Sequence, residues 1–175
     1  VLTGAGGGHF YPLIAVAERV RKEAFIQKII QSDIYFLSDK PYDETALVDN
    51  DIKFIQIPSG KLRVYPSFET VTDLFKTFFG CFVALFKLYS IYPDVVFVKG
   101  GYASFPVAFA AKVLSIPVVV HESDTVPGRV TKWAGKFASR VALSYKEAAS
   151  FYPTEVTAYT GQPIRDSLLP PENFY

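Results

Sequence analysis

The sequence is poor in the residues that crosslink a chain or mark its start. Among its 175 residues there is one cysteine and no methionine. Cys81 cannot form a disulfide within the chain, which fits a reducing compartment. Because Val1 already lies in the first predicted strand, we expect further residues to precede it, and a targeting segment there would not be visible.

Neither sign of charge dominates. The 18 lysines and arginines face 17 aspartates and glutamates, for a net charge of +1. This balance gives no general attraction to nucleic acid, so no nucleic-acid partner is expected. Half of the residues are hydrophobic and 16% are aromatic, which excludes a disordered chain and supplies the core of one domain. No His, Cys, Asp or Glu grouping has the spacing of a metal site, so no metal is expected.

Two nucleotide-binding signatures are missing near the start. The glycines there lack the dinucleotide-binding spacing, and no Gly-Lys-Ser/Thr follows them. What is present is the run GAGGGH at residues 4–9, between an apolar stretch at 1–3 and an amphipathic helix predicted from Tyr11. Glycines at such a junction let the backbone approach a ligand, and the N–H groups of a helix start favour phosphate. The run therefore predicts a phosphorylated substrate.

A second glycine turn strengthens this prediction. The run KGGYAS at residues 99–104 follows a buried strand predicted at 95–98 and precedes an apolar helix predicted at 105–114. In open α/β sheets such turns lie at the same edge, where ligands bind. Two tight turns without a ligand remain the alternative.

Predicted strands and helices alternate along the whole chain. This alternation predicts an α/β fold with a doubly wound parallel sheet. The remaining strands are predicted at residues 34–37, 52–57, 118–120, 141–143 and 156–159, and the remaining helices at residues 68–89 and 127–136. Pro170 and Pro171 are typical of a linker.

The helix predicted at 68–89 has more apolar surface than packing on a sheet requires. One stripe consists of Leu74, Phe78, Cys81, Leu85 and Leu88. A second stripe beside it consists of Phe75, Phe79, Phe82, Phe86 and Tyr89. One stripe is enough for packing, so the second is surplus. The uncharged run at 78–86 is far shorter than the roughly 20 apolar residues of a membrane-spanning helix.

The surplus stripe could cover more core, meet another protein or lie in a membrane interface. Basic neighbours favour the membrane, because they attract anionic lipid. A membrane interpretation assigns contacts to the following residues: Phe75, Phe79, Phe82, Phe86, Lys76, Lys87, Lys132 and Lys136. A thick core helix beside a solvated basic face remains the alternative.

Four separated motifs together resemble the N-terminal half of the MurG enzymes of glycosyltransferase family 28. They are the loop at 4–9 followed by Pro12, the turn at 100–104, His-Glu-Ser-Asp at 121–124 followed by Pro-Gly, and Gly-Gln-Pro-Ile-Arg at 161–165. They stand in the family's order and span nearly the whole chain. Such enzymes transfer N-acetylglucosamine from UDP-GlcNAc to an undecaprenyl-diphosphate-linked muramyl-pentapeptide in peptidoglycan synthesis.

The resemblance implies a GT-B fold, in which two Rossmann-like domains enclose the active site. Residues 1–167 would be the acceptor-binding domain and 168–175 the start of the linker, with the donor-binding C-terminal domain absent from this chain. The implied reaction is an inverting, metal-independent transfer with UDP-GlcNAc as donor substrate and no cofactor. The implied partners are the lipid acceptor, the missing domain in cis or as a separate chain, and an anionic membrane at the cytoplasmic face. Alone, the chain would be inactive.

The site residues follow from this resemblance together with the chemistry of the side chains. Sugar transfer needs a base, and His9 has a suitable ordinary pKa beside the glycine loop; Glu122 would assist it. Contacts to the acceptor diphosphate are assigned to Gly7, Gly8, His9, Gly100, Gly101, Tyr102 and Ser104. Donor contacts are assigned to Gly6, Gly7, Gly8, Asp124 and Arg165. His121 is equally consistent with a structural hydrogen bond, and Tyr102 and Ser104 with capping the next helix.

Two departures from the family pattern leave the substrates open. Gly6 replaces a threonine and Asp124 an asparagine, and a carboxylate beside a diphosphate is unfavourable unless it is neutralised. The donor sugar and the acceptor lipid therefore stay undecided. Two alternatives remain: a non-catalytic membrane-recruiting subunit of a split glycosyltransferase, or a family 28 enzyme that acts on another lipid.

Overall fold

The computed structural model describes residues 1–29, 31–61 and 68–168. Its centre is a seven-stranded parallel sheet with the strand order β3-β2-β1-β4-β5-β6-β7. The strands are β1 Leu2–Gly4, β2 Ile34–Ser38, β3 Ile52–Gln56, β4 Val96–Gly100, β5 Val118–Glu122, β6 Arg140–Leu143 and β7 Thr157–Tyr159. The predicted doubly wound parallel sheet is confirmed, and the strand order reverses between β1 and β4.

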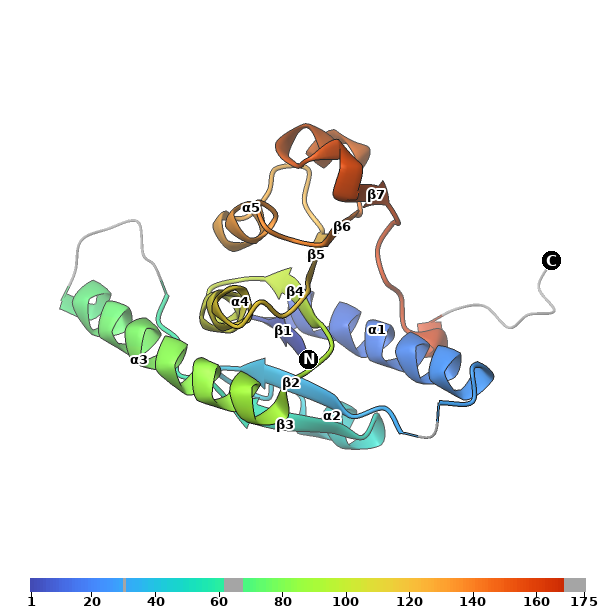
Figure 1. Ribbon diagram of the computed structural model, residues 1–175, viewed down its shortest axis with the longest axis horizontal. Helices are drawn as coiled ribbons and strands as arrows, with labels where there is room; N and C mark the ends of the chain where they lie inside the picture. Colours follow the sequence, from blue (N-terminus) through green and yellow to red (C-terminus); the bar gives the residue numbers. More distant parts are fainter. Residues whose placement is uncertain (30, 62–67, 169–175) are drawn as a thin grey trace.

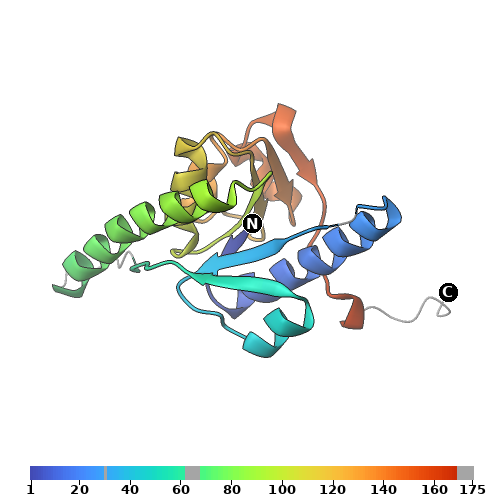
Figure 2. The same cartoon turned by 60° about the horizontal axis from the view of Figure 1, so that its bottom comes forward.

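Helices cover both faces of this sheet (Figures 1 and 2). The helix α1 lies on one face, and α3 and α4 lie on the opposite face. The α-helices are α1 Gly7–Ile26, α2 Glu44–Asp49, α3 Phe68–Ile91, α4 Ser104–Val113 and α5 Arg129–Ala134. The short 3-10 helices are η1 Lys146–Phe151, η2 Thr154–Val156 and η3 Asp166–Leu168. Residues 169–175, which hold most of the predicted linker, lie outside the described residues.

Several predicted boundaries were wrong. The first helix was predicted from Tyr11, but α1 begins at Gly7, so the last glycines of the first loop are its first turn. The helix α2 was not predicted; Asp43 caps it by accepting a hydrogen bond from the Ala46 N–H. The helix predicted at 127–136 is shorter, because α5 ends at Ala134 and Gly135 follows.

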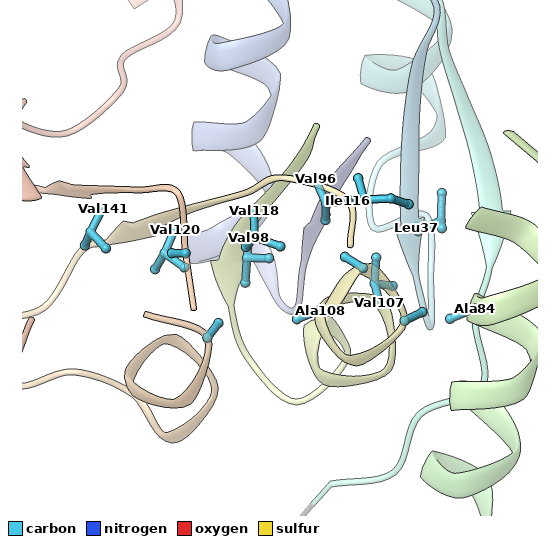
Figure 3. Close-up of a cluster of buried hydrophobic side chains, with 14 of the residues drawn as sticks. Leu37, Ala84, Val96, Val98, Val107, Ala108, Ile116, Val118, Val120 and Val141 are labelled. Atoms are coloured by element: carbon cyan, nitrogen blue, oxygen red, sulfur yellow. The ribbon is translucent and has the colours of Figure 1, made fainter. Parts of the chain in front are cut away.

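The main core lies between the sheet and α4 (Figure 3). Inward-facing valines of the central strands contact α4 through its alanines, which allow a close approach of helix and sheet. The residues labelled in the figure include Val98 and Val118 of the sheet and Val107 and Ala108 of α4, which faces them. Near-continuous apolar strands of this kind are expected in a parallel sheet covered on both faces.

The long helix α3 packs differently from the prediction. It lies against α4, and its buried positions are Gly80, Ala84 and Leu88. A Cβ on Gly80 would overlap the carbonyl oxygen of Pro58, so the helix approaches the chain after β3 too closely for a side chain there. The prediction that Leu74 and Phe78 pack inward was therefore wrong.

Both apolar stripes defined above are exposed over the N-terminal half of α3. The exposed large apolar residues of this helix are Val71, Leu74, Phe75, Phe78, Phe79, Phe82, Phe86 and Tyr89. By length and composition alone, the helix over Glu69–Ile91 is long and apolar enough to cross a membrane, although its uncharged run at 78–86 is short. The surplus apolar surface predicted from the sequence is real and larger than expected.

Candidate functional site

The two glycine turns meet at the carboxyl edge of the sheet. The Ala5 N–H donates to the Gly100 carbonyl at 3.1 Å. Gly101 has a positive φ of 82°, and a Cβ on it would lie 2.6 Å from the Cβ of Ala5. Glycine is therefore required at position 101 both by the backbone angle and by the contact between the turns.

The first turn leaves the start of α1 open. Gly6 has a φ of 82° and caps the helix, with its carbonyl accepting from the N–H groups of His9 and Phe10. A Cβ on Gly6, Gly7 or Gly8 would meet nothing within 4 Å. This stretch of backbone therefore faces free space, as a cradle for a ligand requires.

A cleft of about 430 Å³ lies between the turns and the loop that follows β5. The described residues that line it are His9, Lys61, Lys99, Gly100, Gly101, Tyr102, Glu122, Asp124, Gly128, Arg129, Val130 and Thr131. Three of these side chains are cationic and two are carboxylates, so the lining carries a net charge of +1 when His9 is neutral. The surroundings of the cleft thus favour an anion slightly.

His9 lies on the first turn of α1, beside both glycine turns. A Cβ on Gly100 would lie 3.8 Å from its Cε1 atom. Burial, and next the positive charge of Lys99, lower the pKa of His9 below its ordinary value, against the opposing effect of Asp124 and Glu122. Its buried Nδ1 has no hydrogen-bond partner among the described residues. At neutral pH His9 is therefore an uncharged imidazole that can accept a proton.

Lys99 is the last residue of β4 before the second glycine pair. It is 1% exposed, and its Nζ donates to the Ser123 hydroxyl at 2.5 Å. Burial lowers the pKa of Lys99 to about 8, although Glu122 and Asp124 act to raise it. The side chain is thus a buried cation in the wall of the cleft.

Glu122 ends β5 and is fully engaged by its surroundings. One carboxylate oxygen accepts from the Asp124 N–H at 3.0 Å. The other accepts from the Thr131 hydroxyl, from the Tyr152 hydroxyl at 3.1 Å and from the Gly128 N–H at 3.3 Å. These bonds fold the loop at 123–128 around the carboxylate. The geometry favours Glu122 as a positioning residue for this loop over a proton carrier.

His121 connects the site to the segment after β7. Its Nε2 donates to the Gly161 carbonyl at 3.1 Å, and the Ser144 hydroxyl beside it donates to the Gln162 side chain at 2.7 Å. Burial, then the charge of Lys99, lower the pKa of His121 to about 4. His121 is therefore a neutral, structural residue at ordinary pH.

The hydroxyls of the second turn have partners within the protein. The Tyr102 hydroxyl donates to Asp39 at 2.5 Å, and the Tyr42 hydroxyl donates to the same carboxylate at 2.8 Å. Burial, followed by the bond to Asp39, raises the pKa of Tyr102. The buried Ser104 hydroxyl donates to the Gly100 carbonyl at 2.5 Å. Ser104 stabilises the turn, whereas Tyr102 still lines the cleft.

Arg165 lies outside the residues that line the cleft. Its guanidinium stacks on Tyr11 of α1, 4.6 Å from the ring centre, and the next residue's N–H donates to Glu18. The segment after β7 therefore runs back along α1 (Figure 1). Its Nε is buried without a partner among the described residues.

Comparison with known proteins decides the family. The model of the glycosyltransferase family 28 N-terminal domain matches residues 1–143. The chain belongs to glycosyltransferase family 28. This assignment agrees with the resemblance drawn from the four motifs, all of which except the last lie within the matched residues.

Two relatives of this chain have the same enzyme name. The UDP-N-acetylglucosamine–N-acetylmuramyl-(pentapeptide) pyrophosphoryl-undecaprenol N-acetylglucosamine transferase of Borrelia turicatae is 36% identical over 172 residues, which is 97% of this chain and 46% of that protein. A protein of Bacillus anthracis with the same name, numbered 2, is 34% identical over 171 residues, 97% of this chain and 47% of its own length. The chain spans about half the length of the relatives it matches.

Solved structures show the same fold. MurG of Acinetobacter baumannii superposes with a TM-score of 0.71 at 23% identity, over 95% of this chain and 45% of that one. The UDP-GlcNAc 2-epimerase of Neisseria meningitidis, solved bound to UDP-GlcNAc, gives a TM-score of 0.67 at 14% identity, over 93% and 46%. Both likenesses support the N-terminal half of a two-domain Rossmann-like architecture.

The family 28 fold brings most predicted site residues together. The predicted residues that line the cleft are His9, Gly100, Gly101, Tyr102, Glu122 and Asp124, with Gly6, Gly7 and Gly8 at the adjoining helix start. The motif residues Ser104 and Arg165 have partners elsewhere. Sequence analysis missed Lys99, Lys61 and Thr131 as lining residues. For Lys99 the sequence did offer a signal, because a lysine follows directly on a predicted buried strand.

Proposed function

We propose that this chain is the acceptor-binding half of a glycosyltransferase that transfers N-acetylglucosamine from UDP-GlcNAc to an undecaprenyl-diphosphate-linked muramyl-pentapeptide. The name shared by the relatives supports this proposal. The observation that carries it is the meeting of two glycine turns at a cleft with a slightly positive lining. Free backbone N–H groups at the start of α1 match the oxygens of a diphosphate.

His9 is the proposed base for the acceptor hydroxyl. Its lowered pKa keeps the imidazole neutral at pH 7, and its Nδ1 has no hydrogen-bond partner among the described residues. A neutral imidazole takes the hydroxyl proton as the new glycosidic bond forms at the sugar and the UDP leaves. Glu122 acts by holding the loop that carries Asp124. The transfer is proposed to invert the sugar carbon and to need no metal ion.

The domain assignment is part of the same proposal. Residues 1–167 form the acceptor domain, and 168–175 begin a linker to a donor-binding domain supplied in cis or by a separate chain. That domain holds most of the UDP-GlcNAc, whereas Gly6, Gly7, Gly8, Asp124 and Arg165 contribute from this side. Arg165 would have to leave Tyr11 to do so, since it now stacks on that ring.

The exposed face of α3 is the proposed membrane contact, at the cytoplasmic side of the plasma membrane. The predicted contacts Phe75, Phe79, Phe82 and Phe86 are all exposed. Lys76 and Lys87 of α3, Lys132 of α5 and Lys136 just after α5 are exposed as well, and α4 packs against both of these helices. An undecaprenyl chain remains in the bilayer, so its enzyme must hold the cleft near that surface.

The test is co-sedimentation with vesicles of phosphatidylglycerol and phosphatidylcholine. One set contains undecaprenyl diphosphate carrying the muramyl-pentapeptide, a second contains undecaprenyl monophosphate, and a third contains diacylglycerol. We expect the first set to bind the wild type at least tenfold more tightly than the other two. His9→Ala should weaken this preference and leave binding to the other two sets unchanged, because His9 is assigned a contact to the acceptor diphosphate.

The outcomes separate the alternatives. Equal binding to all three sets contradicts an acceptor site for a diphosphate lipid and leaves a membrane-recruiting role. Preference for diacylglycerol indicates a family 28 enzyme with another acceptor. Binding to none of the vesicles assigns the phenylalanine face to a protein interface.

A further inference from the structure

The buried ammonium group of Lys99 makes fewer hydrogen bonds than it can donate. It can donate three hydrogen bonds, and the structure shows one, to the Ser123 hydroxyl. No carboxylate of the described residues lies within 4.0 Å of its Nζ. A buried cation with one neutral partner is costly to keep charged. A ligand with several negatively charged oxygens would remove that cost.

The carboxylates near Lys99 are not free to pair with it. Glu122 already accepts from Thr131, Tyr152 and two backbone N–H groups. Asp124 lies exposed on the loop after β5 and acts on Lys99 through its charge rather than through a close ion pair. The two remaining donor positions of the ammonium are thus available to the cleft.

The position of Lys99 fits an oxyanion. It lines the cleft immediately before Gly100, which has a positive φ of 106°. Across the junction, Gly7 and Gly8 lie in the first turn of α1, where a Cβ on either would meet nothing within 4 Å. A diphosphate bound there has backbone donors on one side and a cation on the other.

The positive charge of Lys99 also balances the negative charge of Asp124 in the lining of the cleft. A carboxylate in a diphosphate site repels the ligand unless a cation balances it. With Lys99, Lys61 and Arg129 in the lining, the two carboxylates are outweighed. Without Lys99 the net charge of the lining would be zero.

We propose that Lys99 binds a phosphate group of the acceptor diphosphate directly. This inference rests on the proposed function, because it names a further binding residue of the same site. The lysine is a specificity residue for diphosphate over monophosphate or neutral lipid, since its ammonium contacts the additional phosphate oxygens.

The test compares wild type, Lys99→Met, Asp124→Asn, the double variant and Lys22→Met on the vesicle sets described above. Methionine keeps the length and removes the charge; Lys22 is an exposed lysine of α1 outside the cleft lining and serves as the charge control. We expect Lys99→Met to bind the diphosphate vesicles at least tenfold more weakly, with no change on diacylglycerol vesicles. Lys22→Met should bind within threefold of the wild type, whereas Asp124→Asn, which removes a repelling carboxylate, should bind at least as tightly as the wild type.

The double variant distinguishes contact from charge balance. Binding that stays weak in Lys99→Met/Asp124→Asn supports a direct contact, whereas full recovery overturns it and leaves Lys99 as a counter-charge. Circular dichroism of each variant establishes that the fold is kept. If the wild type shows no preference for diphosphate, the proposed function fails as well; if it does and Lys99→Met equals it, only the Lys99 assignment fails.

A soluble diphosphate separates the two possible sources of this group. Titration with UDP in place of the lipid should show little dependence on Lys99. A Lys99-dependent affinity for UDP, with unchanged lipid binding, would overturn the assignment to the acceptor.

Discussion

At the level of single residues, the half-buried His9 and the buried Lys99 line the cleft, the buried His121 lies nearby, and burial lowers the pKa of each. For His9 and His121 this keeps the imidazole neutral at pH 7, whereas Lys99 remains mostly charged because its pKa is about 8. The division is useful for binding and chemistry: a neutral histidine accepts a proton, and a charged lysine holds an anion. Burial of the same kind thus gives different charge states in neighbouring residues.

Because of His121, the free energy of unfolding should depend on pH in the acidic range. The unfolded chain takes up a proton near pH 6.5 and the folded chain near pH 4, so the unfolded state binds more protons between these values. The free energy of unfolding should therefore fall as the pH drops from 6.5 to 4, by up to about 3 kcal/mol from this residue. Urea unfolding of wild type and His121→Gln checks this.

Glutamine keeps an N–H donor for Gly161 and does not titrate, so the variant should lose most of the slope. His9→Gln, whose own lowered pKa acts in the same direction, is the matched control. A slope in His121→Gln equal to that of the wild type would show that other groups cause the acid sensitivity.

Lys99 makes stability depend on pH in the same direction as His121, but in a higher pH range, so that the penalty is present at neutral pH. Its folded pKa of about 8 lies below the ordinary 10.5, so the folded state is penalised below pH 8 and relieved as the pH rises to 10.5. Lys99→Met should therefore raise the free energy of unfolding at pH 7, by up to about 3 kcal/mol, and the gain should vanish near pH 10.5. Thermal unfolding at pH 7 and pH 10 measures it; a loss of stability at pH 7 would contradict a costly buried charge.

At the scale of elements, the close approach of α3 depends on glycine. Gly80→Ala places a Cβ on the Pro58 carbonyl and should cost at least about 2 kcal/mol through displacement of the helix. Gly8→Ala, in the first turn of α1, meets nothing within 4 Å and should change stability by less than about 1 kcal/mol. Equal effects of the two changes in urea unfolding would contradict this packing.

The same glycine explains why sequence periodicity was wrong about Leu74 and Phe78 of α3, although Leu88 of the predicted stripe is buried and Leu85 packs against the core. Large apolar residues at helical spacing predict the buried stripe, yet the ridge that packs consists of small residues at positions 80 and 84. The sheet, by contrast, was predictable, because runs such as 95–98 and 118–120 are apolar and end in glycine or polar turns. Contacts between α3 and a distant chain segment leave no signal in local periodicity.

The exposed aromatic face of α3 should bind membranes without being needed for folding. Phe79 is 61% exposed and Phe82 46%, so Phe79→Ser/Phe82→Ser should lower affinity for phosphatidylglycerol vesicles at least tenfold with little loss of stability. Phe25→Ser, at an 85% exposed phenylalanine of α1, is the matched control and should bind like the wild type. If the Phe79→Ser/Phe82→Ser variant unfolds, the two phenylalanines have a structural role instead.

Across the whole molecule, the site residues converge because the strand order reverses between β1 and β4. The turns after these neighbouring strands, 4–9 and 99–104, are about 90 residues apart in the sequence yet share a hydrogen bond. The glycine turns and the edge at which they meet could be predicted from the sequence. Ser104 and Arg165 contact other partners, and Lys99 is buried. Both outcomes depend on side-chain packing, which no sequence motif indicates.

The last prediction concerns what this chain does by itself. The described cleft lies within this chain, which spans about half the length of its relatives. We therefore expect it to bind diphosphate-lipid vesicles and to transfer no labelled N-acetylglucosamine from UDP-GlcNAc to the lipid, because the donor has too few contacts here to be held for in-line attack. The full-length Borrelia turicatae relative is the positive control for the assay. Transfer by the 175-residue chain above the enzyme-free background would show that donor binding, too, lies within this domain.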